Sequence, residues 1–227
     1  MELPRINQYL VTVGLAKSRR KADEIIKQGR VKVNGSTLTD LSFRVAPSDT
    51  VLLDDQAGQI RSDIYIVYNK PVGQICSHQH QGQSPTVFDA LPKNFASLKI
   101  AGRLDKDSRG LIILSSDGQF VQQLSHPGQG KVKTYIVKTK QTVAMGEISA
   151  LNHGVILDDG KSNLKVNKIK SNTLRIEMKE GRKRQIRRSL ESVKLDVIDL
   201  ERVGIGTYSN PHLPEGKFDF IMPEDVL

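Results

Sequence analysis

The sequence predicts an α+β protein built from two domains. The first fifty residues contain two helical patterns followed by short strands around an Asn-Gly turn. Beyond residue 63, many short β-rich runs alternate with turn signals and only two or three helices intervene, which favours a largely antiparallel sheet. A polar stretch at 54–63 separates the two parts and is typical of a linker. We therefore expect one domain at 1–53 and a second at 64–227.

The composition is that of a soluble globular protein. Of 227 residues, 37% are hydrophobic and 26% are charged, which excludes a disordered acidic tail and a collagen-like chain. No apolar run approaches the roughly 18 residues that a membrane helix needs, so we expect no contact with a membrane. Glu2 and Arg5 argue against a secretory signal and for a cytoplasmic location. Cys76 is the only cysteine, which excludes an intrachain disulfide.

The basic charge is concentrated in two segments. The chain has 34 basic and 25 acidic side chains, a formal charge of +9, and such surfaces attract polyanions. Residues 17–32 contain seven basic and two acidic residues, and residues 175–188 contain the same numbers. Each segment could be an ordinary solvated face, and the local structure has to decide between that interpretation and a binding surface.

The first basic segment belongs to a pair of predicted helices. Ser18 is placed to cap the second helix and Gly29 to end it. The apolar residues that recur at helical spacing are Ile6, Tyr9, Leu10 and Val13 in the first helix, over 4–13, and Ala22, Ile25 and Ile26 in the second.

The second helix begins with three cations, although helix N-termini favour acidic residues. Arg19, Arg20 and Lys21 would oppose the helix dipole unless an anion docks there. Backbone N–H groups and the three side chains would then converge on one phosphate.

The next residues predict a small sheet. Val31 and Val33 alternate with charged residues, Asn34-Gly35 is a hairpin signal, and residues 51–53 resume a strand. With SRRKA at 18–22, GRVKVNG at 29–35 and DTV at 49–51, this region resembles the S4 RNA-binding domain. The resemblance implies structured RNA as the partner, with these contact residues: Arg5, Ser18, Arg19, Arg20, Lys21, Arg30 and Lys32.

The second domain is predicted to be rich in strands. We expect short helices at 119–124 and 145–151 and a longer one at 183–193. The expected strands are at 64–68, 99–104, 111–116, 135–138, 164–169 and 173–178.

Several catalytic templates are absent. Gly130-Lys131 is followed by Val132, and Ser125 occupies the place of the first glycine, so a phosphate-binding loop for ATP is not supported. His78 and His80 have no nearby carboxylate or cysteine partner, which favours an ordinary surface loop over a metal site. No Gly-x-Ser-x-Gly motif is present.

A dense polar loop, GRLDKDSRGL at 102–111, lies between two apolar strands. Such loops often carry reactive groups, although Asp105 and Asp107 could simply form turns. Together with NKPVG at 69–73, TVFDALP at 86–92, KTYIV at 133–137 and EGRKRQIRR at 180–188, it resembles the motifs of pseudouridine synthases with an S4 domain. The resemblance implies a mostly antiparallel mixed sheet flanked by helices. Ser189, where the family usually has an apolar residue, and the absence of tryptophan near Phe218 are local departures.

The resemblance also implies roles for single residues. Pseudouridine formation breaks the bond between uracil N1 and ribose C1′ and rejoins the base through C5, without cofactor or metal. Asp105 would be the carboxylate at the sugar, as attacking group or as base. Tyr135 would pack on the uracil; the alternative interpretation is that its ring simply fills the core. Arg187 would pair with Asp105.

The remaining predicted site residues bind rather than react. Arg184 is the alternative partner for Asp105, and Ile186 would form the floor under the base. Arg103 would fill the space of the extruded base, and Lys133 shares a strand face with Tyr135. The expected phosphate contacts of this domain are Arg182, Lys183 and Arg188.

Three functions are compatible with this pattern. The first is a monomeric rRNA pseudouridine synthase, acting on folded rRNA that includes rRNA in an assembling ribosomal subunit. The second is an RNA-binding assembly factor without turnover, and the third is an RNA N-glycosidase that releases uracil. The combined presence of Asp105, Tyr135 and Arg187 favours the first.

Overall fold

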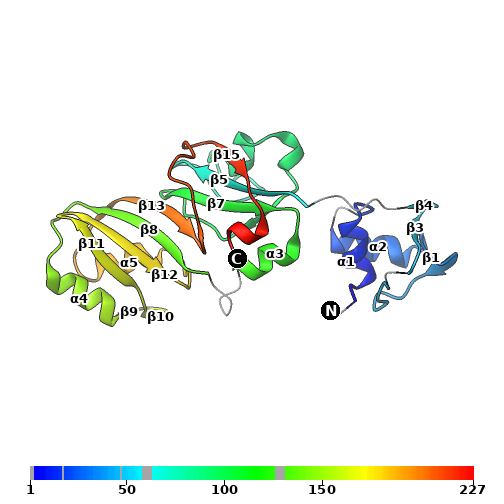
Figure 1. The fold of residues 1–227 in the computed structure, drawn as a ribbon, viewed down its shortest axis with the longest axis horizontal. Coiled ribbons are helices and arrows are strands. Elements are labelled where there is room, and N and C mark those ends of the chain that lie inside the picture. Colours follow the sequence, from blue (N-terminus) through cyan, green and yellow to red (C-terminus); the bar gives the residue numbers. More distant parts are fainter. Residues whose placement is uncertain (1–2, 17, 47, 58–62, 126–130) are drawn as a thin grey trace. The chain divides into compact units, whose positions relative to one another are not determined.

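The computed structural model describes residues 3–16, 18–46, 48–57, 63–125 and 131–227. The chain forms two compact units, unit 1 at Met1–Asp63 and unit 2 at Ile64–Leu227 (Figure 1). Lys17 of the first basic segment and residues 58–62 of the expected linker lie outside the described residues. Within the described ranges, no helix has the length and apolar character that crossing a membrane requires.

Unit 1 consists of two helices and a small antiparallel sheet with the strand order β2-β1-β3-β4. The Ser18 hydroxyl caps α2 by accepting a hydrogen bond from the Lys21 backbone N–H at 3.2 Å, as the sequence predicted. Ala22, Ile25 and Ile26 are buried in the core of this unit. The element bounds are α1 Ile6–Thr12, α2 Arg19–Lys27, β1 Val31–Val33, β2 Ser36–Leu38, β3 Val51–Leu53 and β4 Gln56–Ala57.

Two tight hairpins shape this sheet. Asn34 and Gly35 connect β1 and β2 with positive φ angles of 51° and 83°. Asp54 and Asp55 do the same between β3 and β4, at 49° and 64°. Positive φ at both positions is what a two-residue hairpin turn requires, and aspartate tolerates it better than most residues. The first residues of the stretch predicted as linker therefore extend the sheet instead.

Unit 2 contains a nine-stranded mixed sheet with the order β11-β12-β8-β13-β7-β5-β15, in which β14 also pairs with β13 and β6 with β7. Its strands are β5 Tyr65–Lys70, β6 Lys99–Ala101, β7 Arg109–Ser115, β8 Lys133–Thr139, β11 Lys165–Lys170, β12 Thr173–Met178, β13 Val197–Ile205, β14 Tyr208–Ser209 and β15 Phe218–Phe220. A separate hairpin is formed by β9 Val155–Leu157 and β10 Gly160–Ser162.

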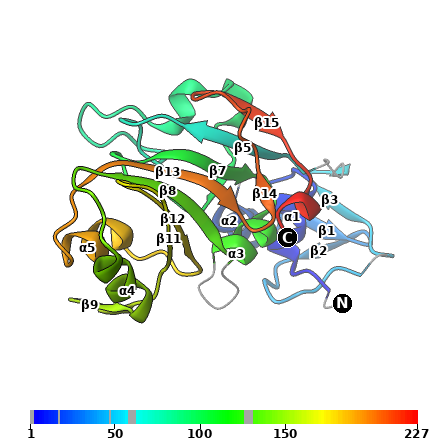
Figure 2. The same ribbon diagram turned by 60° about the vertical axis from the view of Figure 1, so that its left-hand side comes forward.

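The helices of unit 2 cover different faces of the sheet. They are α3 Gly118–Ser125, α4 Met145–His153 and α5 Gln185–Glu191, with single 3₁₀ turns at Val87–Ala90, Lys93–Phe95 and Pro223–Asp225. Figure 2 shows α4 and α5 beside the half of the sheet that contains β8, β11 and β12. Ile66 and Ile112 pack into the core cluster that includes α4 and α5, whereas Val67 and Ile113 pack into the cluster that includes α3. Strands β5 and β7 are therefore apolar on both faces, as centrally placed strands require.

The sheet is antiparallel apart from one parallel contact, between β13 and β7. This contact is short and joins Glu201 to Arg109 and Arg202 to Gly110. The α+β class with a mixed, largely antiparallel sheet is thus confirmed. Strand β13 was not predicted because charged residues interrupt its apolar alternation, yet it lies in the middle of the sheet.

Candidate active site

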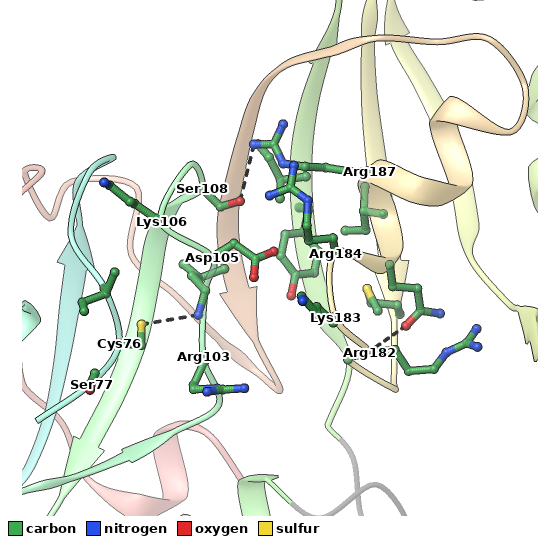
Figure 3. Close-up of a pocket in the computed structure, with 18 of the residues that line it drawn as sticks. Cys76, Ser77, Arg103, Asp105, Lys106, Ser108, Arg182, Lys183, Arg184 and Arg187 are labelled. Atoms are coloured by element: carbon green, nitrogen blue, oxygen red, sulfur yellow. Dashed lines mark hydrogen bonds between the residues drawn. The ribbon is translucent and has the colours of Figure 1, made fainter. Parts of the chain in front are cut away.

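A cavity of about 520 Å³ opens in unit 2 (Figure 3). Four parts of the chain line it: the loop after β5, the loop between β6 and β7, one face of strands β8, β12 and β13, and the segment that leads into α5. The lining residues used below are Cys76, Arg103, Leu104, Asp105, Lys106, Tyr135, Met178, Arg182, Lys183, Arg184, Ile186, Arg187 and Leu200. Most of the motifs that are far apart in the sequence therefore meet at one place.

Asp105 projects into the cavity from the 102–110 loop (Figure 3). Within the described part of the chain, its carboxylate makes no hydrogen bond or ion pair, while its backbone carbonyl accepts a bond from the Ser108 N–H at 3.1 Å. Glycines with positive φ mark both ends of the loop, Gly102 at 77° and Gly110 at 110°. A Cβ at Gly110 would clash with the Arg202 carbonyl oxygen, so the close approach of β7 to β13 requires glycine there.

Two buried cationic side chains bind backbone carbonyls in and directly after this loop. The Lys70 ammonium donates to the Ser108 carbonyl at 2.6 Å, and Arg202 Nε donates to the Leu111 carbonyl at 2.6 Å. Both side chains are fully buried, and this burial lowers the pKa of Lys70. Neither residue had a predicted role. Lys70 belongs to the recognised NKPVG motif, which could have revealed it, but Arg202 lies in the strand that was not predicted.

Arg187 does not form its expected ion pair with Asp105. It contacts Asp107 instead, with Nη2 2.6 Å from the Asp107 carbonyl and Nε 3.3 Å from its carboxylate. Arg184, the alternative partner, also binds the Asp107 carboxylate, at 2.8 Å. The turn closed by the bond from Ser108 to Asp105 separates the two aspartates, so that Asp107 reaches α5 and Asp105 faces the cavity. Burial lowers the pKa of the Arg187 guanidinium, and the nearby charges of Asp107 and, more weakly, of Asp105 oppose this lowering.

Part of the cavity lining is apolar. Tyr135 and Ile186 are nearly buried and line it together with Met178 and Leu200. Tyr135 lies directly opposite Ile176 on β12, in the middle of the sheet. This surface can hold a planar base beside a carboxylate. Lys133 lies outside the lining and donates to the Lys179 carbonyl at 3.3 Å, and burial lowers its pKa.

The cavity is strongly cationic. Of the described residues, six with basic side chains line it, against the single carboxylate of Asp105. Arg103 and Lys183 are exposed and have no ion pair in the described residues, and Lys106 binds only the Ser84 hydroxyl, at 2.8 Å. These three cations are available to an anionic ligand at the mouth of the cavity.

Other predicted RNA contacts are occupied by carboxylates. Arg182 and Arg188 both bind Asp159, at 2.6 and 2.7 Å, in the turn between β9 and β10. In unit 1, Arg30 pairs with Asp54 and Lys32 with Asp55, and Lys21 pairs with Glu24.

The remaining contacts predicted in unit 1 differ in what they leave open to a ligand. Arg5, Arg19 and Arg20 are exposed. The Ser18 oxygen serves as the helix cap.

Chemically, the site offers one free carboxylate, one aromatic hydroxyl and a cationic rim. Among the described residues, no three histidine, cysteine or acidic side chains are grouped to hold a metal ion. A carboxylate of this kind can stabilise or trap positive charge at a sugar carbon, and the rim can bind phosphates. In a chain that also has a small helical unit with a cationic helix start, this arrangement defines an enzyme that acts on RNA.

Comparison with known families identifies the chain more closely. Residues 64–192 match the model of the RNA pseudouridylate synthase family, and residues 4–51 match the S4 domain. The chain therefore belongs to the RNA pseudouridylate synthase family, and both predicted resemblances are confirmed.

Individual relatives cover nearly the whole chain. The chain is 33% identical over 207 residues to the ribosomal large subunit pseudouridine synthase B of Bacillus subtilis (strain 168), covering 88% of this chain and 84% of that protein. It is 35% identical over 215 residues to an uncharacterized RNA pseudouridine synthase of Mycobacterium leprae (strain TN), covering 90% and 84%. A crystal structure of a pseudouridylate synthase aligns with a TM-score of 0.69 and 26% identity, over 97% of each chain.

Proposed function

We propose that this protein is an rRNA pseudouridine synthase in which Asp105 acts at C1′ of a uridine. One observation carries the proposal. The Asp105 carboxylate makes no hydrogen bond or ion pair in the described structure, and it faces a cavity that has an apolar lining on one part and a cationic rim. The ribosomal RNA substrate is inferred from the relative in Bacillus subtilis, which is named for the large ribosomal subunit.

The reaction rearranges atoms without adding any. The bond between N1 and C1′ breaks, the uracil turns, a bond forms between C5 and C1′, the C5 proton leaves and N1 gains a proton. Asp105 either attacks C1′ or removes a sugar proton, and both routes need an ionised carboxylate at the sugar. The apolar surface formed by Tyr135 and Ile186 would hold the freed uracil and keep water from the sugar until C5 has reacted.

The other residues act around this step. Tyr135 would stack on the uracil and move the proton at C5. Arg187 would place its positive charge near Asp105 without bonding to it directly, because its direct partner is Asp107. Arg103 would occupy the space of the extruded base, and Lys106 and Lys183 would bind phosphates at the rim.

The full proposal includes a cytoplasmic monomer that binds folded rRNA through both units. Arg19 and Arg20 are the side chains of unit 1 best placed for phosphates, since they are exposed and have no ion pair among the described residues. Size-exclusion chromatography with light scattering tests the monomeric state directly, since the measured molar mass of a dimer would be twice that of the chain.

Nucleoside analysis tests the proposed reaction. The protein is incubated with rRNA transcripts, which are then digested and analysed by mass spectrometry and reverse-phase chromatography. We expect pseudouridine. Free uracil with abasic sites would identify an N-glycosidase instead, and unchanged uridine in every transcript would favour a binding protein without turnover.

The variant Asp105→Asn tests the residue. It removes the charge but keeps the shape, so turnover should fall on the order of 100-fold or more while RNA affinity stays nearly unchanged. The exposed Asp219 on β15 provides the matched control, Asp219→Asn, because it lies outside the cavity. An Asp105→Asn variant with activity within a few-fold of the parent would remove Asp105 from this role.

A further inference from the structure

The turn between β9 and β10 is linked to α5 by a dense set of ion pairs. Asp159 binds Arg182 Nη1 at 2.6 Å and Arg188 Nη2 at 2.7 Å, and Asp158 also pairs with Arg188. Arg182 donates in addition to the backbone carbonyls of Asp159 and Lys161, at 2.8 and 2.9 Å. Both arginine side chains are about three-quarters buried by these contacts.

A buried polar layer continues this link. Gln185 Nε2 donates to the Ser162 hydroxyl at 3.0 Å, and the Ser189 hydroxyl donates to the same oxygen at 2.9 Å. The Gln185 carbonyl oxygen of the side chain accepts a bond from the Arg182 backbone N–H at 3.1 Å. The Ser189 hydroxyl thereby ties α5 to the hairpin.

Helix α5 depends on such contacts for its position. It has only seven residues and begins at Gln185, directly after the N-cap residue Arg184, whose φ of 50° is left-handed and whose side chain does not cap the helix. Short helices without caps are marginal by themselves, and a non-glycine residue in this conformation is strained. Tertiary contacts must therefore hold both the helix and the segment before it.

The N-terminal turn of α5 and its N-cap residue also hold the 102–110 loop. Arg187 and Arg184 bind Asp107, two residues after Asp105, and both line the cavity. The helix and the segment before it thus make two sets of ion pairs, one to the hairpin turn and one to the loop of Asp105. A shift of α5 would move Ile186, Arg184 and Arg187 relative to the Asp105 carboxylate.

We propose that Asp159, assisted by Asp158, is a positioning residue for the reaction: it holds Arg182 and Arg188 so that α5 presents Ile186 and Arg187 correctly to the cavity. On this view Arg182 and Arg188 are not phosphate contacts, because their guanidinium groups are already engaged. The inference rests on the proposed function and assigns the hairpin turn to the same site.

The two roles of these arginines predict opposite results for Asp159→Asn. If the arginines position α5, the single-turnover rate at saturating enzyme should fall about 10-fold, since small displacements of reacting groups are costly, while the RNA dissociation constant stays within about twofold. If they bind phosphates, freeing them from Asp159 should tighten RNA binding and leave the rate unchanged. That second result would overturn the inference.

Matched variants separate positioning from a general loss of structure. Asp159→Glu keeps the carboxylate and should restore most of the rate, and Glu191→Gln removes one exposed charge from the far end of α5 and should change nothing. If Asp159→Asn does not fold, Asp158→Asn removes only one of the ion pairs and should give a smaller loss of rate. Equal losses in Asp159→Asn and Glu191→Gln would contradict the inference.

Hydrogen exchange gives a readout that needs no activity. Amides of residues 182–190 should exchange faster in Asp159→Asn than in the parent, with the amides of β5 and β7 unchanged. Unchanged exchange at 182–190 would overturn the inference even if no transcript were modified. A parent protein that forms no pseudouridine would instead refute the proposed function and leave this structural result standing.

Discussion

Asp105 and Asp107 show how two identical side chains in one loop take different roles. They are two residues apart, and the turn closed by Ser108 directs one into the cavity and the other to Arg184 and Arg187. The partner of a carboxylate therefore depends on where the turn directs it. Asp107 joins the loop to α5, whereas Asp105 faces the cavity, and no bond of its carboxylate is found among the described residues.

We predict that Asp107→Asn lowers the single-turnover rate by about 10-fold, because Arg184 loses its ion pair and Arg187 keeps only its bond to the Asp107 backbone carbonyl. Stability should change by less than about 1 kcal/mol, since the Asp107 side chain is 44% exposed and solvent screens its ion pairs. Rapid-quench kinetics and urea unfolding measure the two quantities. Asp107→Glu should recover part of the rate, and an unchanged rate in Asp107→Asn would show that the anchor is dispensable.

At the level of elements, the short parallel contact between β7 and β13, called the seam below, is critical for the position of the 102–110 loop. These strands share only two paired positions, yet the seam carries the end of the 102–110 loop. Arg109 reinforces it by binding both oxygens of Asp199, at 2.9 and 3.0 Å, and Glu201 at 2.6 Å. Side chains on the face opposite the cavity thereby help to hold Asp105 in place.

This seam should make stability depend on pH. Hydrogen bonds from Arg109 lower the pKa of Asp199 in the folded protein. A lowered native pKa means that the stabilisation is fully present above the unfolded value of about 3.9 and is lost as pH falls toward the native value.

We predict that Asp199→Asn loses about 1 to 2 kcal/mol of unfolding free energy at pH 7, because the ion pair is three-quarters buried. The difference from the parent should be the same at pH 5 and should shrink at pH 3, because the unfolded parent there takes up a proton at Asp199 more readily than the folded parent does. Urea titrations at the three pH values measure it. A difference that stays constant down to pH 3 would mean that the charge of Asp199 is not its source.

For the whole molecule, the charge is unevenly divided between the two units. Residues 1–63 contain 10 basic and 8 acidic residues, and residues 64–227 contain 24 and 17. Several cations of unit 1 are also paired with its own carboxylates. Unit 2 therefore carries most of the net charge that attracts RNA, and each unit has a hydrophobic core of its own.

We predict that deletion of residues 1–63 leaves unit 2 folded, with a single-turnover rate at saturation within about threefold of the full chain. RNA affinity should fall, and the salt dependence should flatten, without vanishing, by about 0.9 for each phosphate that the shortened chain no longer neutralises. Filter binding across a salt series measures this. The full chain with Arg19→Ala and Arg20→Ala should show part of the same weakening, and an unaltered slope in the deletion would mean that unit 1 binds no phosphates.

Local patterns were sufficient to predict most of the elements. The cap at Ser18, the turn at Asn34-Gly35 and strand β12 follow from neighbouring residues, and all are observed. The sequence pattern did not predict strand β13. Its neighbours β8 and β7, which bury Arg202 and Leu200, are distant in the sequence. The turn at Asp54-Asp55 was not predicted because two aspartates are a weaker hairpin signal than Asn-Gly.

The identity of the family can be read from the chain alone, because motifs such as the one at 102–111 are local and occur in a recognisable order. The partners of the charged side chains cannot be read in this way. Only the folded arrangement assigns Arg187 to Asp107, Arg188 to the hairpin turn, and Lys70 to the Ser108 carbonyl. An ion pair depends on positions in space that many distant contacts set together, and a list of charges does not contain those positions.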